Sequence, residues 1–134
     1  MAIEIRKPLR QFVDISLSFS PHPLTGDLPV LRDTRAINAS LRNCVMTGLR
    51  EKPFLRDFGS QVSSFLFDMF DDDSGSLIED AIRRSIVNGE PRCEIDEVNV
   101  EPRLEENNMK IEVIYTLVGH DEVFTFSTLL YPSR

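Results

Sequence analysis

The sequence predicts an α+β domain in which an N-terminal strand and three helices precede an antiparallel three-stranded C-terminal meander. Apolar residues recur at helical spacing between residues 34 and 89, and at strand spacing between residues 95 and 131. The 134 residues are 41% hydrophobic, which suffices for one domain with a modest core. We therefore expect a single domain over residues 1–134, in which residues 1–12 form an extended N-terminal arm.

The first expected element is a half-buried strand over residues 13–19, because apolar and polar side chains alternate there. Its apolar members are Val13, Ile15, Leu17 and Phe19. Residues 20–29 contain prolines at positions 21, 23 and 29, so we expect no regular structure there. Within this stretch, Thr25-Gly26-Asp27 is a turn signal.

Two helices are expected next. The first begins at a cap provided by Asp33 or Thr34 and runs to about residue 50. Its apolar face is Ile37, Leu41, Val45 and Leu49. The segment EKPFLRDFGS interrupts the pattern, and Ser60 can cap a second helix that ends at DDDSGS. The apolar stripe of that second helix is Val62, Phe65, Leu66, Met69 and Phe70.

A third helix is expected to open at Ser76, because Glu79 lies three residues later and completes a capping-box pattern. Its apolar residues are Leu77, Ile78, Ala81, Ile82 and Ile86. Gly89 suits a left-handed helix stop, and Pro91 prevents the helix from continuing.

Three strands follow the helices. The first holds Ile95, Val98 and Val100, whose uneven spacing predicts a bulge. The second is marked by Met109, Ile111, Val113, Tyr115 and Leu117. The third runs from Val123 to Tyr131, with turns predicted at Asn107-Asn108 and at residues 119–121.

Charge and composition argue against several classes of function. The net charge of −7 disfavours binding to nucleic-acid phosphates, and the basic pairs Arg6-Lys7 and Arg83-Arg84 are too short to form a local patch. No apolar run approaches the ~20 residues that span a bilayer. The N-terminal sequence lacks an apolar signal region, so we expect synthesis in the cytosol. There, Cys44 and Cys93 are expected to be free thiols.

The sequence offers no convincing catalytic, cofactor or metal residue. An Asp71-Asp72-Asp73 run resembles the start of a calcium loop, but its twelfth position is Ile82, where a glutamate is needed. His22 and His120 have no second ligand at metal spacing. A chain with 22 acidic residues always places some carboxylates close together, so a glycosidase pair cannot be inferred.

The triplet Glu90, Pro91 and Arg92 at the helix-to-strand corner is the most informative local feature. Proline fixes its own φ and moves Glu90 out of helical geometry. A buried carboxylate or guanidinium must be paired. The corner is therefore either an internal brace or a docking bracket for another chain. The same three residue types recur at 101–103, where a plain strand end is expected.

The third predicted strand is a candidate site for strand addition. Residues 122–131 contain one charged residue, Glu122, and no proline that would protect an exposed edge. We expect the N-terminal strand to cover one edge of the meander and to leave the other free.

Three stretches together resemble one family, the baseplate wedge proteins of contractile phage tails, also known as the lysozyme-like wedge or sheath-initiator family. They are residues 18–47, the segment EKPFLRDFGS, and the NGEPR sequence that carries the family's E-P-R motif. The resemblance covers roughly residues 13–134. Lys52 stands where the family usually has arginine, and Arg56 where it commonly has proline. Lysine keeps the charge at position 52 but loses bidentate hydrogen bonding. The PLTGD segment favours a phage tail over related injection machines.

The resemblance implies a non-enzymatic component of the virion tail baseplate, assembled in the host cytoplasm. Its partners would be other baseplate wedge proteins and the tail sheath protein, with tail tube or hub proteins as further candidates. Glu90, Pro91 and Arg92 would bind the wedge core bundle. The sheath would bind the edge strand through Val123, Phe124, Thr125, Phe126, Ser127 and Thr128. The alternatives are a peptidoglycan hydrolase and a small protein-binding adaptor of the same fold.

Overall fold

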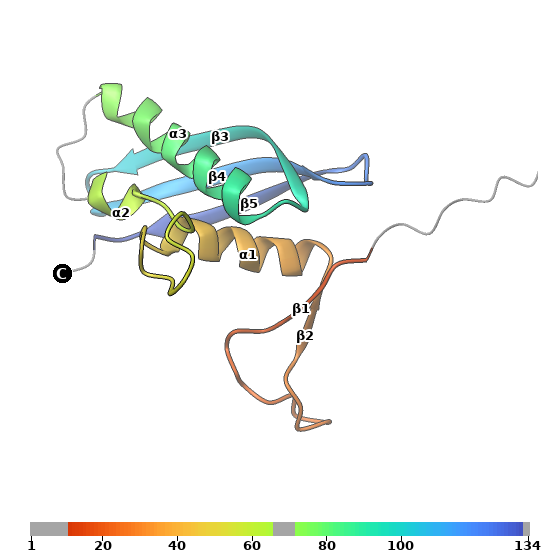
Figure 1. Ribbon diagram of the computed structural model, residues 1–134. Coiled ribbons are helices and arrows are strands. Elements are labelled where there is room, and N and C mark those ends of the chain that lie inside the picture. Colours follow the sequence, from red (N-terminus) through yellow and green to blue (C-terminus); the bar gives the residue numbers. More distant parts are fainter. Residues whose placement is uncertain (1–10, 66–71, 133–134) are drawn as a thin grey trace, which may run out of the picture.

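The computed structural model describes residues 11–65 and 72–132 and confirms the α+β architecture (Figure 1). Within these two ranges, two short strands come first, followed by three helices and three longer strands. The elements are β1 (Val13–Ile15), β2 (Val30–Arg32), α1 (Thr34–Met46), α2 (Val62–Phe65), α3 (Asp72–Gly89), β3 (Cys93–Arg103), β4 (Asn108–Leu117) and β5 (Val123–Leu130). Residues 1–10 of the predicted arm lie outside the described residues.

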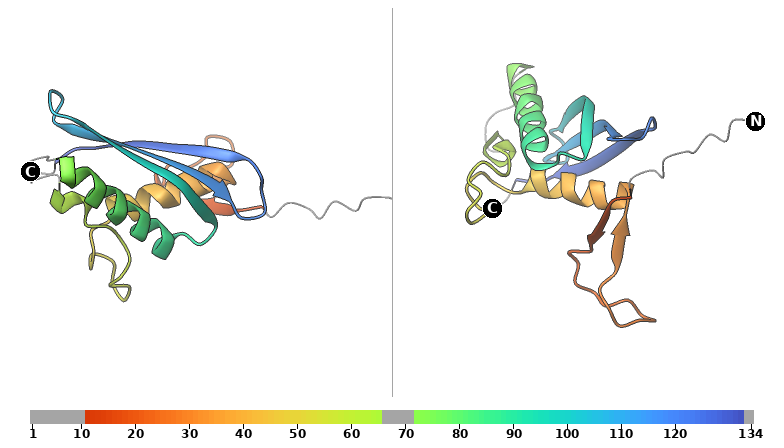
Figure 2. Two further views of the ribbon diagram at one scale, coloured as in Figure 1. Left: turned by 90° about the horizontal axis from the view of Figure 1, so that it is seen from above. Right: turned by 45° about the vertical axis from the view of Figure 1, so that its right-hand side comes forward.

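The three C-terminal strands form the predicted antiparallel meander, in the order β3-β4-β5. The predicted bulge is present, since the β3–β4 register shifts between Ile95 and Glu97. One face of β4 is buried, as its alternation predicts, through Met109, Ile111, Val113, Tyr115 and Leu117. The helices cover this side of the sheet, with α3 packed against β3 and α1 against β5 (Figures 1 and 2).

The helices complete the core largely as their spacing predicts. Ile37, Leu41 and Val45 of α1 are buried, but Leu49 lies beyond the end of the helix and is 38% exposed. Their counterparts in α3 are Ile78, Ile82 and Ile86, all fully buried. Within residues 11–65 and 72–132, no helix has the length and apolar content needed to cross a bilayer.

The predicted limits of the second and third helices are wrong in detail. Helix α3 already includes Asp72, so Ser76 and Glu79 lie inside it and form no capping box. Ser60 does not cap α2, because its hydroxyl donates to the Val45 carbonyl oxygen at 2.6 Å. Helix α2 has four described residues, with Val62 buried. The remaining stripe residues Leu66, Met69 and Phe70, like Asp71, lie outside the described residues.

Gly89 ends α3 for a different reason from the predicted left-handed stop. Its φ is not positive, and the Glu90 amide still donates to the Ile86 carbonyl oxygen at 2.8 Å, as in a helix. A Cβ at position 89 would lie 2.6 Å from the Cys44 sulfur and 3.1 Å from the Phe58 ring. Glycine is therefore needed here because α1 and α3 approach each other closely.

The N-terminal region differs most from expectation. β1 has three residues and pairs with β2, which the sequence did not predict, in a separate two-stranded sheet. This hairpin projects away from the meander beside α1, so it covers neither edge of the larger sheet (Figures 1 and 2). The predicted turn is confirmed, since the Gly26 amide donates to the His22 carbonyl oxygen at 2.8 Å. The residues expected to be half-buried are more than 50% exposed: Val13, Ile15, Leu17 and Phe19.

Candidate functional site

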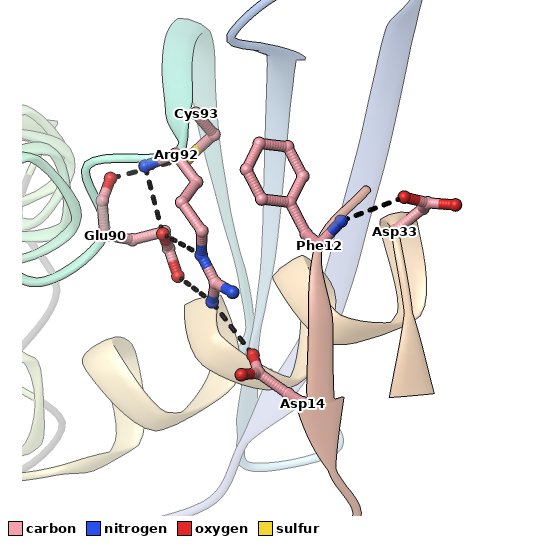
Figure 3. Close-up of polar contacts among 6 residues, drawn as sticks. All are labelled: Phe12, Asp14, Asp33, Glu90, Arg92 and Cys93. Carbon is pink, nitrogen blue, oxygen red and sulfur yellow. Dashed lines mark hydrogen bonds and ion pairs between the residues drawn. The ribbon is translucent and has the colours of Figure 1, made fainter. Parts of the chain in front are cut away.

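The Glu90-Pro91-Arg92 corner holds an ion pair with two hydrogen bonds (Figure 3). Arg92 Nε donates to Glu90 Oε1 at 2.7 Å, and Arg92 Nη2 donates to Oε2 at 2.7 Å. The Arg92 backbone amide also donates to Oε1 at 3.1 Å. The Glu90 side chain is only 2% exposed, so its charge depends on these donors. Pro91 turns the chain so that the two side chains meet.

Arg92 also joins the corner to the N-terminal hairpin. Its Nη2 donates to Asp14 Oδ2 of β1 at 2.9 Å, and its guanidinium carbon lies 5.7 Å from the centre of the Phe12 ring (Figure 3). Arg92 remains 26% exposed and Asp14 41% exposed. The corner thus ties β1 to the α3–β3 connection and keeps two charged groups within reach of a partner.

A second pair of contacts closes the base of the hairpin. The Asp33 amide donates to the Phe12 carbonyl oxygen at 2.7 Å, and the Phe12 amide donates to Asp33 Oδ1 at 3.2 Å. Asp33 occupies the N-cap position of α1 as predicted, but its side chain makes no capping hydrogen bond. Its carboxylate holds β1 in place beside the helix instead.

The surroundings of the corner set the protonation of several groups. Burial alone raises the pKa of Glu90, but hydrogen bonds from Arg92 and Ser40 outweigh it and hold the pKa below its ordinary value. The hydrogen bond to Glu90 raises the pKa of Arg92. Burial raises the pKa of Cys44 to about 11 and of Cys93 to about 12, and the Glu90 charge adds to both. Both cysteines are free and buried, so they are poor nucleophiles at neutral pH.

A hollow of about 290 Å³ lies between the hairpin and α1, beside the corner. Its lining is Asp14, Ile15, Leu17, Ala39, Ser40, Asn43 and Arg92. It combines an ion pair with the exposed apolar side chains of Ile15 and Leu17. Such a surface is suited to another protein chain, whereas Glu90 itself lies too deep for direct contact.

The second Glu-Pro-Arg triplet is in a very different setting. Glu101 is 65% exposed, and its carboxylate lies 3.8 Å from Arg103 Nε. Arg103 also meets the exposed Glu106 at 3.5 Å. The same residue types therefore form a buried brace at one position and a weak surface pair at the other.

The predicted sheath-binding residues lie on β5, at one edge of the described meander. Side chains alternate along the strand: Val123, Thr125 and Ser127 are exposed, whereas Phe126 is buried. Phe124 and Thr128 are half-buried. Because β4 separates β5 from β3, the structure places this edge and the Arg92 corner on opposite sides of the sheet and does not bring them together.

The described residues offer little for catalysis or cofactor binding. A pocket of about 580 Å³ beside α3 has a single carboxylate, Asp57, among its described lining residues, whereas glycoside hydrolysis by two carboxylates needs a second. In residues 11–65 and 72–132, no group of three or more His, Cys, Asp or Glu side chains could hold a metal ion.

Sequence reasoning missed Asp14 and Phe12 as parts of the corner. They lie about eighty residues before Arg92 along the chain, with 78 positions separating Asp14 from Arg92. One signal was available, because Asp14 stands on the polar side of an alternating strand. That polar side is the one that faces the body of the protein.

One family model matches the chain, and several solved structures share its fold. The family model for baseplate wedge protein gp25 matches residues 31–122. A crystal structure from Geobacter sulfurreducens, described as a candidate tail lysozyme, aligns with a TM-score of 0.67 and 24% identity over 73% of this chain and 89% of that chain. No curated protein sequence matches the chain.

Two cryo-electron microscopy structures share the fold at lower identity. A chain of the anti-feeding prophage baseplate aligns with a TM-score of 0.64 and 21% identity, over 92% of this chain and 87% of that one. A chain of the postcontracted pyocin R2 baseplate aligns with a TM-score of 0.56 and 13% identity, over 91% of this chain and the whole of that one.

Proposed function

This chain belongs to the family of baseplate wedge protein gp25, and on that premise we propose that it is a structural component of a contractile phage tail baseplate. The observation that carries the proposal is the family match over residues 31–122. The fold shared with chains of two baseplates supports it. The chain binds other baseplate wedge proteins and the tail sheath protein in the virion tail, with tube or hub proteins as further candidates. The chain is incorporated into the tail while the particle assembles in the host cytoplasm.

The corner is the proposed contact with the wedge core bundle. Because Glu90 is buried against Arg92, direct contact falls to the exposed parts of Arg92 and Asp14 and to the hollow beside them. Glu90 and Pro91 act by holding Arg92 in place. Ile15 and Leu17 add apolar surface that a helix of the bundle can cover.

The β5 edge is the proposed sheath contact. An edge strand presents backbone N–H and C=O groups with no partner on one side. The N-terminal hairpin does not cover β5. The exposed side chains of β5 are uncharged at Val123, Thr125 and Ser127. A terminal arm of a sheath subunit would extend the sheet by main-chain hydrogen bonds and so start sheath polymerisation.

A proline scan of adjacent positions tests this contact. Along an edge strand, neighbouring amides alternate between the sheet and solvent, so Ser127→Pro and Thr128→Pro remove one amide of each kind. The variant that keeps the melting temperature identifies the outward amide. That same variant is expected to abolish sheath nucleation, and Thr125→Pro should behave like Ser127→Pro because it has the same parity.

The result that rejects strand addition is sheath nucleation at the normal rate by the stable proline variant. If both proline variants unfold the sheet, hydrogen exchange of the β5 backbone amides tests the contact instead. Outward amides of β5 should then be protected in assembled particles and exchange freely in the isolated wild-type chain. Equal exchange in both states also rejects the contact.

A hydrolase is the second candidate, because one solved structure with this fold is described as a candidate tail lysozyme. We expect no cell-wall hydrolysis by this chain, since the pocket beside α3 has one described carboxylate. The assay incubates purified protein with peptidoglycan and quantifies released sugars. Turnover that disappears in Asp57→Asn would establish the enzyme. The third candidate is a small protein-binding adaptor of the same fold. If sheath protein fails to co-assemble with the chain, the adaptor is favoured over the baseplate component.

A further inference from the structure

The loop over residues 49–58, between α1 and α2, carries an exposed aromatic side chain in its middle. Phe54 is 102% exposed, and its neighbour Leu55 is 52% exposed. Phe54 also has a φ of 67°, in the left-handed region that bulky residues rarely adopt. Since a fully exposed ring makes no packing contact that offsets this strain, the fold of the isolated chain gives no reason for phenylalanine here.

The base of this loop is firmly held. The Ser60 amide donates to the Thr47 carbonyl oxygen at 2.8 Å, and the Ser60 hydroxyl donates to that of Val45 at 2.6 Å. Gly59 has a φ of 107°, and a Cβ there would lie 2.5 Å from the Thr47 oxygen. The loop therefore returns to the end of α1 by a tightly packed path that only glycine allows.

Contacts within the loop also fix its shape. The Glu51 carboxylate accepts a hydrogen bond from the Gly48 amide at 2.8 Å. Lys52 Nζ lies 4.2 Å from the centre of the Phe58 ring, so the lysine substitutes for the stacking that an arginine would provide. A loop that is ordered before binding loses little entropy when it binds.

The charges of the loop indicate the partner's chemistry. Arg50 and Arg56 are exposed, and neither forms a salt bridge with another residue in the part of the chain that the structure describes. They flank Phe54 in a protein whose net charge is −7. A partner with carboxylates around an apolar pocket would match both features.

We propose that the 49–58 loop is a docking loop: Phe54 and Leu55 enter an apolar pocket of a partner protein, and Arg50 and Arg56 pair with carboxylates on its rim. The partner is another protein of the particle, so this inference rests on the proposed function. The surface is separate from the Arg92 corner and from the β5 edge. Protein is favoured over nucleic acid or a membrane, because the chain is acidic and Glu51 and Asp57 offset two of the loop's cations.

The test places a photoreactive phenylalanine analogue at position 54 and irradiates assembled particles. Mass spectrometry of the cross-linked peptides is expected to identify one protein, in a segment with apolar residues and nearby Asp or Glu. The matched control carries the analogue at Leu104, which is 75% exposed in the β3–β4 turn, and should give no such product. Cross-links at 54 to nucleic acid or lipid, or none at all, would overturn the docking loop.

Substitutions separate binding from folding. Phe54→Ala is expected to reduce incorporation of the chain into particles about tenfold without lowering the melting temperature, as for a binding hot spot. Phe54→Gly should reduce it equally and raise the melting temperature, because glycine relieves the left-handed φ. Arg50→Glu with Arg56→Glu should also reduce incorporation, whereas Leu104→Ala should not. Normal incorporation of Phe54→Ala, or a parallel fall in melting temperature, contradicts the inference.

A further cross-linker at Ser127 distinguishes this inference from the proposed function. If the chain is in the particle and cross-links to sheath through position 127 but to nothing through position 54, only the docking loop fails. If purified particles contain no copy of the chain, both fail.

Discussion

Replacing Arg92 with alanine should lower the free energy of unfolding by about 3 kcal/mol at neutral pH. The change removes two guanidinium hydrogen bonds of 2.7 Å from Glu90 and one of 2.9 Å from Asp14. Glu90, 2% exposed, keeps the backbone amide of residue 92 but loses the opposite charge. Losing one partner of a buried pair costs about 3–5 kcal/mol. The lower end applies because Arg92 is 26% exposed and water can enter its place.

The free energy of unfolding lost in Arg92→Ala should depend on pH in a defined direction. In the wild type, the pKa of Glu90 is lowered, so its stabilising contribution is complete above the ordinary value of 4.5 and is lost as pH falls through the folded value. In Arg92→Ala, burial dominates and the pKa of Glu90 rises, so the variant is relieved of a buried charge as it protonates. The stability difference between the two proteins should therefore begin to narrow above that ordinary value, as Glu90 of the variant protonates, and should continue to narrow until the pH reaches the lowered pKa of the wild type.

Thermal and denaturant unfolding at neutral and acidic pH measures both effects. At about 4 °C for each kcal/mol, the melting temperature should fall by about 12 °C at neutral pH. Arg103→Ala is the matched control, because its triplet has the same residue types but an exposed pair at 3.8 Å, and it should cost less than about 1 kcal/mol. Equal losses for the two variants, or a deficit unchanged by pH, would refute the buried brace. The proposed bundle contact further predicts a loss of particle yield in Arg92→Ala, beyond what the melting temperature explains.

Three further predictions concern the core around this corner. Gly89→Ala should cost about 1–3 kcal/mol in denaturant unfolding, because its Cβ would lie 2.6 Å from the Cys44 sulfur, and Cys44→Ala should restore part of the loss. The thiols of Cys44 and Cys93, with pKa values raised to about 11 and 12, should resist alkylation in the folded protein near neutral pH and react fully in denaturant; native labelling faster than unfolding would contradict this. Tyr115→Phe removes a 2.6 Å hydrogen bond to Asn38 Oδ1, so it should cost about 1–3 kcal/mol by thermal unfolding, and an unchanged melting temperature would count against that bond.

Local periodicity was sufficient to predict the meander and the two main helices. A strand of period two has only two faces, and in β4 one face is wholly apolar from Met109 to Leu117, so the buried face could be read directly. The uneven spacing of Ile95 and Val98 likewise predicted the bulge. Three local segments were enough to indicate the family.

Only the tertiary structure decided which distant residues each predicted element contacts. The strand predicted over residues 13–19 forms only at Val13–Ile15. Its apolar side chains are exposed, whereas Asp14 on its polar side meets Arg92. The capping-box pattern at Ser76 is overridden because the helix begins earlier. Position 89 needs glycine because the Cys44 sulfur of the neighbouring helix lies too close for a Cβ. The local sequence around Gly89 does not show this contact. Sequence pattern encodes the period of an element, whereas burial and ion pairing depend on segments brought together from distant positions, such as Asp14 and Arg92.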